Sequence, residues 1–107
     1  MNRNKEEILI LELIHECFEK IDEEDLKLAP NDVFILLKKQ NNRINISANE
    51  IRNILKRWGF TPEDNTKSYY GIDLMSHGEY IKVDRRGRFY TIKKKLFYKI
   101  FDALMQI

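Results

Sequence analysis

The sequence predicts an α+β domain in which helices come first, short strands follow and another helix ends the chain. Two changes of hydrophobic period support this fold class. Apolar residues recur at helical spacing over much of 5–58, the stretch 68–92 is rich in aromatic and β-branched residues, and helical spacing returns at 93–107. At 107 residues the chain can bury one core, with little material for a second. We therefore expect one domain with four parts, which are residues 1–29, 30–60, 66–92 and 93–107.

The first helix is expected over residues 5–21, where apolar residues form one stripe and charged residues cover the other side. The stripe consists of Ile10, Leu11, Leu13, Ile14, Cys17, Phe18 and Ile21. Cys17 is the only cysteine, so no intramolecular disulfide can form, and its position predicts a small buried thiol. The residues that follow, 22–29, predict an acidic connection to the next helix.

A second, shorter helix is expected from a cap at Asn31 or Asp32 to about Lys39, with a polar turn after it at 40–43. Residues 44–46 alternate between apolar and polar side chains. This pattern leaves two alternatives open, a short strand or a turn whose isoleucines pack into the core.

Residues 47–58 predict the best-marked helix of the chain, because their side chains divide into a buried face and a polar face. Ser47 and Glu50 have the spacing of a capping box, and Gly59 suits the left-handed residue that commonly ends a helix. The expected buried face consists of Ile51, Ile54, Leu55 and Trp58. The opposite face carries only amide and basic side chains, from Asn49, Arg52, Asn53, Lys56 and Arg57.

The composition after Phe60 favours a loop over 61–67, followed by three strands and a closing helix. The strands are expected at 68–75, 79–83 and 88–92, and the helix at 93–107. A turn sequence at 84–87 ends in glycine, as a tight hairpin commonly requires. We therefore expect the last two strands to form a hairpin whose tip carries Arg85 and Arg86.

The charge of the chain is polarised along the sequence, although the net charge is only +2. The first 32 residues hold four basic and ten acidic side chains, whereas residues 79–107 hold eight basic and three acidic ones. A positive field confined to one part of the surface would attract a polyanion and orient it. The alternative interpretation is a set of solvated faces without a specific partner.

The sequence offers little that favours catalysis, a cofactor or a membrane. His15 lies among glutamates on a helical surface, where solvated charge is more common than a metal site. No glycine-rich phosphate loop is present, and no apolar run reaches the roughly 18 residues that cross a bilayer. Glu79 and Lys82 are spaced so that they point to opposite faces of a strand, which does not suit a nuclease site. We therefore expect a non-catalytic protein with no cofactor and no metal, in the cytoplasm by default.

The order of the expected elements resembles the winged helix-turn-helix superfamily over residues 30–92. The resemblance implies that helix 47–58 is the recognition helix and that hairpin 79–92 is the wing, although the turn at 40–46 is longer than the usual roughly three or four residues. Trp58-Gly59-Phe60 closes a polar helix ahead of the strand residues Tyr70-Gly71-Ile72. This narrower pattern is similar to the C-terminal winged helix of phage and plasmid primase-helicases. Their primase and motor domains have no counterpart here, so neither activity is implied.

These observations predict a protein that binds double-stranded DNA, as a transcription regulator or a replication accessory. Arginine can contact phosphates or guanine, and asparagine can bind adenine through two hydrogen bonds. The residues expected to contact DNA are Asn49, Arg52, Asn53, Lys56, Arg57, Lys82, Arg85, Arg86, Arg88, Lys93 and Lys94. The apolar terminal helices suggest a homodimer that presents two recognition helices to one duplex. The alternative is a protein interaction module on the same scaffold, in which the basic groups only increase solubility.

Overall fold

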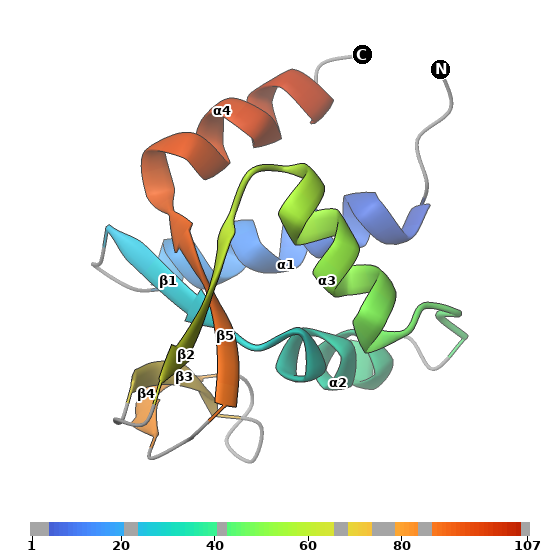
Figure 1. Cartoon of the computed structure of the whole chain (residues 1–107). Coiled ribbons are helices and arrows are strands. Elements are labelled where there is room, and N and C mark those ends of the chain that lie inside the picture. The colour runs from blue at the N-terminus through green and yellow to red at the C-terminus, as the bar shows by residue number, and fades with distance from the viewer. Residues whose placement is uncertain are drawn as a thin grey trace.

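The computed structural model describes residues 5–20, 24–40, 43–65, 69–73, 79–83 and 87–105. Within these ranges the chain forms four helices and five strands, and the predicted α+β class is confirmed (Figure 1). The helices are α1 Lys5–Lys20, α2 Pro30–Gln40, α3 Ala48–Arg57 and α4 Lys94–Met105. The strands are β1 Asp25–Leu28, β2 Thr61–Asn65, β3 Tyr69–Asp73, β4 Glu79–Val83 and β5 Gly87–Lys93.

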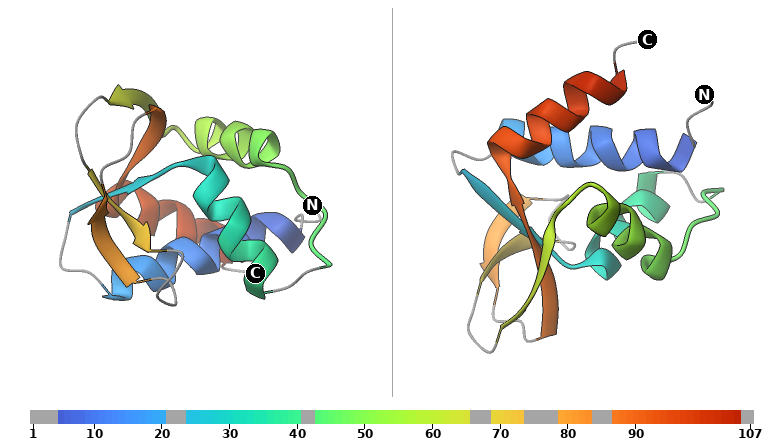
Figure 2. Two further views of the ribbon diagram at one scale, coloured as in Figure 1. Left: turned by 90° about the horizontal axis from the view of Figure 1, so that it is seen from below. Right: turned by 45° about the horizontal axis from the view of Figure 1, so that its top comes forward.

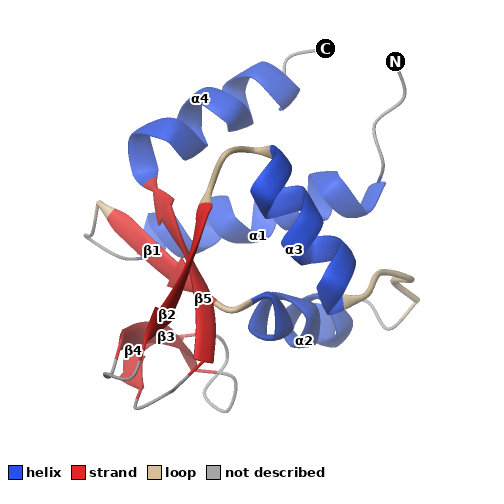
Figure 3. Cartoon of the chain, in the orientation of Figure 1, coloured by secondary structure: helices blue, strands red, loops and turns tan. Residues whose placement is uncertain are grey.

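The principal sheet has three antiparallel strands in the order β1-β5-β2, so β5 is its centre. Tyr90 lies in the middle of β5, in register with Leu28 on one side and Pro62 on the other. Strands β3 and β4 form a separate two-stranded antiparallel sheet. Figure 3 shows the strands gathered at one end of the molecule, with α2 and α3 beside them.

Two predictions about the strands are wrong. Residues 61–65 form β2 instead of a loop, because β2 is an edge strand, where Pro62 can be accommodated. The expected hairpin over 79–92 does not form, since β4 pairs with β3 while β5 pairs with β1 and β2. A turn sequence shows where the chain reverses, but it does not determine which strand becomes the neighbour.

The acidic connection predicted over 22–29 also contains a strand, β1. Leu26 and Leu28 point into the core and alternate with exposed Asp25 and half-buried Lys27. Four residues are too few for a clear alternation in the sequence, and the pairing with β5 is what makes this segment a strand.

The core is built around α1, which passes behind the sheet and α3 in Figure 1. The predicted apolar stripe of α1 is buried from Ile10 to Phe18, while Ile21 lies outside the described residues. Ile44 and Ile46 are buried in a segment without regular structure, which confirms the packed turn over the short strand. The core side chains from the other elements include Leu26, Leu28, Val33, Leu37, Ile51, Leu55, Phe60, Tyr90, Ile92 and Phe97.

Cys17 is buried in this core, as predicted. Burial raises the pKa of its thiol to about 12, and the nearby charge of Glu16 adds to the shift. A thiol with so high a pKa is protonated at neutral pH, and the thiolate is the reactive form. Cys17 is therefore an inert part of the core.

The last helix, α4, packs against α1 through aromatic rings, and Figure 2 shows it following directly on β5 and lying alongside α1. Phe97 is fully buried and its ring centroid lies 5.5 Å from that of Phe18. The ring of His15 stacks on Phe101 with a centroid distance of 4.4 Å. None of the described helices is long and apolar enough to span a membrane.

Candidate nucleic-acid interface

Helix α3 begins and ends where the sequence predicts. The backbone N–H of Glu50 donates to Oγ of Ser47 at 3.1 Å, and this hydroxyl in turn contacts the carboxylate of Glu50. At the other end Gly59 has a φ of +97°, and its N–H donates to the carbonyl oxygen of Lys56 at 2.9 Å. Both ends of α3 are thus defined by local hydrogen bonds, which fixes the direction of every side chain between them.

The two predicted faces of α3 are present in the structure. Ile51, Ile54 and Leu55 are buried, and Trp58 just beyond the helix is half-buried. The opposite side, called the outer face below, consists of Asn49, Arg52, Asn53, Lys56 and Arg57. All of these side chains are exposed except that of Arg52, which is half-buried. The buried side anchors the helix, and the outer face presents amide and cationic groups to solvent.

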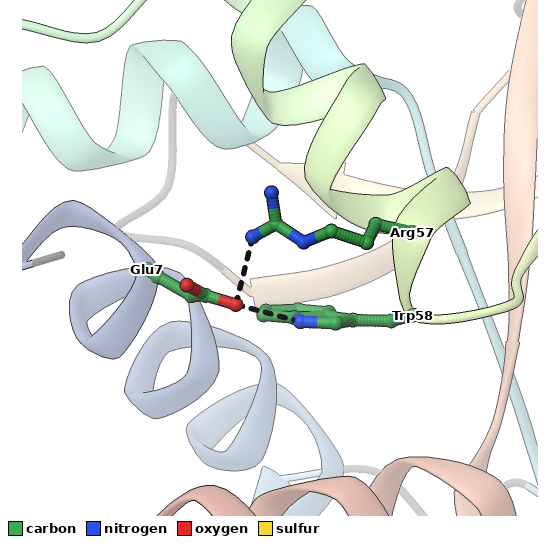
Figure 4. Close-up of polar contacts among 3 residues, drawn as sticks. All are labelled: Glu7, Arg57 and Trp58. Carbon is green, nitrogen blue, oxygen red and sulfur yellow. Dashed lines mark hydrogen bonds and ion pairs between the residues drawn. The ribbon is translucent and has the colours of Figure 1, made fainter. Parts of the chain in front are cut away.

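At the C-terminal end of α3, Arg57 and Trp58 are bound to α1 (Figure 4). Nη2 of Arg57 and Nε1 of Trp58 donate to the same atom, Oε1 of Glu7, at 3.0 and 2.8 Å. Glu7 is only 13% exposed, whereas the side chain of Arg57 is 62% exposed. Arg57 therefore already neutralises an internal carboxylate and is less available to an external anion than its exposure suggests.

At the N-terminal end of α3, the polar contact of Arg52 stays within the helix. Its Nη2 donates to Oδ1 of Asn49, one turn earlier. This contact aligns an arginine and an asparagine side by side on the outer face. Lys56, exposed one turn further along, extends the same row of donors.

Two further predicted DNA contacts, Lys93 and Lys94, lie on β5 and α4. Lys93 ends β5 and pairs in register with Asp25, at the opposite end of that strand from Gly87. Lys94 begins α4, where its backbone N–H donates to the carbonyl oxygen of Glu24 at 2.7 Å and its Nζ lies 5.9 Å from the centre of the Tyr98 ring. These two lysines belong to the junction of the sheet with α4.

The predicted wing residues are only partly described. Lys82 lies on β4 in register with Tyr70, and Arg88 lies on β5 in register with Asp64. Arg85 and Arg86 lie outside the described residues. Because β4 and β5 do not pair with each other, Lys82 and Arg88 belong to two different sheets.

Glu7 and Tyr90 could not be assigned to this region from the sequence. Glu7 lies 51 positions from Trp58, and a contact at that separation leaves no local pattern. Tyr90 is an aromatic residue of a predicted strand, and only the folded chain shows that it faces α3. In the described part of the chain, no group of three or more His, Cys, Asp or Glu residues could hold a metal ion.

Comparison of the chain with protein-family models, curated proteins and solved structures finds no match.

Proposed function

We propose that this chain is a winged-helix protein that binds double-stranded DNA through the outer face of α3. One observation carries the proposal: a helix fixed at both ends and along one side exposes an opposite side made only of amide and basic residues. Such a helix suits the major groove of DNA, which is wide enough to admit it. Of the other described helices, α1 is acidic, α4 is apolar on much of its surface, and α2 exposes only Asn31, Lys39 and Gln40.

The order of elements supports the winged-helix part of the proposal. Helix α2 leads to α3, and the antiparallel pair of β2 and β5 follows, as expected for a helix-turn-helix with a wing. In Figure 1, α3 stands at the surface beside these two strands. The wing in this proposal is the β2 and β5 pair instead of hairpin 79–92. Arg88 lies on β5, and the other basic residues of 82–88 precede this strand in the sequence.

The chemistry of the outer face matches what DNA offers. Asn49 and Asn53 can each bind adenine through two hydrogen bonds. Arg52 and Lys56 can contact guanine or phosphate. Arg57 is bound to Glu7, so we expect it to contribute less than these four. We propose a role as a transcription regulator or a replication accessory, since each of these roles requires DNA binding without catalysis.

A protein interaction module is the second candidate, and the apolar surface of α4 favours it. Leu96 is 37% exposed and Met105 is 38% exposed, and Ile100, Phe101 and Leu104 are only partly covered. The stripe of α1, by contrast, is used inside the core. A homodimer would therefore form mainly through α4, and it is compatible with DNA binding by α3.

A titration of the full chain with random duplex and with single-stranded DNA at two salt concentrations separates these functions. A helix that neutralises about three phosphates should lose roughly fortyfold in affinity between about 50 and 200 mM salt. We expect this loss, together with tighter binding to duplex. An affinity that does not respond to salt, or no binding at the lower salt concentration, would contradict the proposal.

A further inference from the structure

A pocket of about 290 Å³ opens between the start of α2, the first half of α3 and the middle of β5. Its described lining consists of Pro30, Ala48, Asn49, Arg52 and Tyr90. The size is at the lower end of the range of pockets that hold small molecules. The lining combines apolar surface from Pro30 and Ala48 with polar groups from α3, and the buried side chain of Tyr90 lies beneath it.

Two residues of this lining each carry a polar atom that lacks a hydrogen-bond partner. Within the described part of the chain, neither the hydroxyl of Tyr90 nor Nε of Arg52 is paired, and both atoms are shielded from solvent. The side chain of Tyr90 is fully buried, with 0% exposed. A buried polar group without a partner costs about 1 to 3 kcal/mol, so such groups are rare and call for a physical explanation.

The geometry points to a binding site for a small organic anion. We propose that a small shift of the Arg52 side chain opens Nε of Arg52 and the hydroxyl of Tyr90 to the pocket, and that the carboxylate or phosphate then accepts a hydrogen bond from each. Arginine can only donate, and its positive charge excludes a cationic ligand. The pocket is larger than a single oxyanion requires, and the apolar part of the lining accommodates a compact apolar body attached to the anionic group.

Occupation of this pocket has a consequence for α3. Arg52 belongs both to the pocket lining and to the outer face. An anion that holds Arg52 would remove one donor from DNA, and by linkage DNA would weaken the binding of the anion. This consequence rests on the proposed function, whereas the binding of the anion does not.

The test is an NMR titration of the full isotope-labelled chain with phenyl phosphate, benzoate, inorganic phosphate and, as a neutral compound, benzyl alcohol. We expect saturable shifts in the amide signals of Ala48, Asn49, Arg52 and Tyr90 with phenyl phosphate or benzoate. Whichever of these two compounds binds more tightly shows whether the site prefers a phosphate or a carboxylate. Inorganic phosphate should bind more weakly, because it lacks the apolar body, and the neutral alcohol should not saturate.

Tyr90→Phe is the decisive variant, because it removes only the hydroxyl and leaves the ring in the core. We expect affinity for the anion to fall about three- to tenfold, the worth of one hydrogen bond, with no loss of thermal stability. Tyr98→Phe is the matched control, since Tyr98 lies on α4 and does not line the pocket. Arg52→Gln, at a half-buried position of α3, provides a second variant and should weaken binding of the anion at least as much.

The proposal is overturned if neither organic anion binds, if benzyl alcohol or inorganic phosphate binds equally well, or if Tyr90→Phe and Arg52→Gln both keep the wild-type affinity. No DNA is present in this experiment. A negative result would therefore leave DNA binding by α3 untouched, and a failure to bind DNA would leave the anion site untouched.

Discussion

The two ends of α3 place the same type of side chain in different circumstances. At the C-terminal end, Arg57 and Trp58 both donate to Glu7, so this end is bound to α1. At the N-terminal end, Arg52 bonds to its own helix and borders a pocket. Arg57 is thus more exposed than Arg52, yet it is Arg57 that already contacts another helix. Counting cations on a helix face overestimates how many are available to a partner.

The difference divides α3 into an anchored end and an open end. The anchored end holds α3 against α1. There, one carboxylate oxygen of Glu7 accepts two hydrogen bonds. The open end carries Asn49 and Arg52 next to strand β5. We expect substitutions at the anchored end to change stability and substitutions at the open end to change binding.

The largest expected effect tests the anchored end. Glu7→Ala leaves Nε1 of half-buried Trp58 and the guanidinium of Arg57 without their acceptor, so the free energy of unfolding should fall by about 1 to 3 kcal/mol. Urea denaturation measures this change. Glu12→Ala, at an exposed position of the same helix, is the matched control and should stay within about 0.5 kcal/mol of wild type. Equal losses in the two variants would show that Glu7 is not an anchor.

The second effect concerns Arg52 and Lys56, the two basic residues of the outer face that take no part in the contact with Glu7. Arg52→Ala with Lys56→Ala should lower the affinity for duplex DNA by about tenfold or more and reduce the salt slope by about two, because two phosphate or base contacts are lost. The thermal midpoint should change little, since these residues contribute nothing to the apolar core. Fluorescence anisotropy with labelled duplex measures the affinity.

Arg57→Ala provides the comparison for that double variant. It should weaken DNA binding clearly less, because Arg57 is bound to Glu7 in the free protein. A loss as large as that of the double variant would erase the distinction between the two ends. Wild-type affinity in the double variant would remove α3 from the interface altogether.

The smallest expected effect concerns the buried side of α1, where the thiol of Cys17 makes stability depend on pH. Burial, followed by the charge of Glu16, raises the pKa of Cys17 to about 12 in the folded protein, against about 8.5 when unfolded. The stability that the protonated thiol contributes is present below the unfolded pKa and is lost as pH rises toward the folded value. Between about pH 9 and pH 10 the wild type should lose about 1 kcal/mol relative to Cys17→Ala. Parallel unfolding free energies over this interval would place Cys17 outside the core.

The bounds of α3 and its two faces could be predicted because every signal is local. Ser47, Glu50 and Gly59 mark the ends within a few residues, and the apolar period marks the buried side. The same reasoning predicted the apolar stripe of α1 and the burial of Cys17. These features depend on side chains separated by one to a few helical turns.

The strand pairing and the anchor of α3 could not be predicted because they join distant segments. Strand β5 takes its neighbours from residues 25–28 and 61–65, and its turn sequence carries no information about either. Pro62 and the acidic residues beside it favoured a loop, although an edge strand accommodates them. The contact between Glu7 and Trp58 spans most of the first half of the chain and depends on how α1 and α3 pack.

DNA binding by the outer face of α3 is tested most directly by a map of the surface that duplex DNA contacts. The full chain, labelled with ¹⁵N, is titrated with a random duplex at low salt, and amide shifts are followed by NMR. If the outer face of α3 binds DNA, the largest shifts will cluster at Asn49, Arg52, Asn53 and Lys56, with small shifts along α4. Shifts centred on α4, or distributed evenly over the surface, would contradict DNA binding by the outer face of α3.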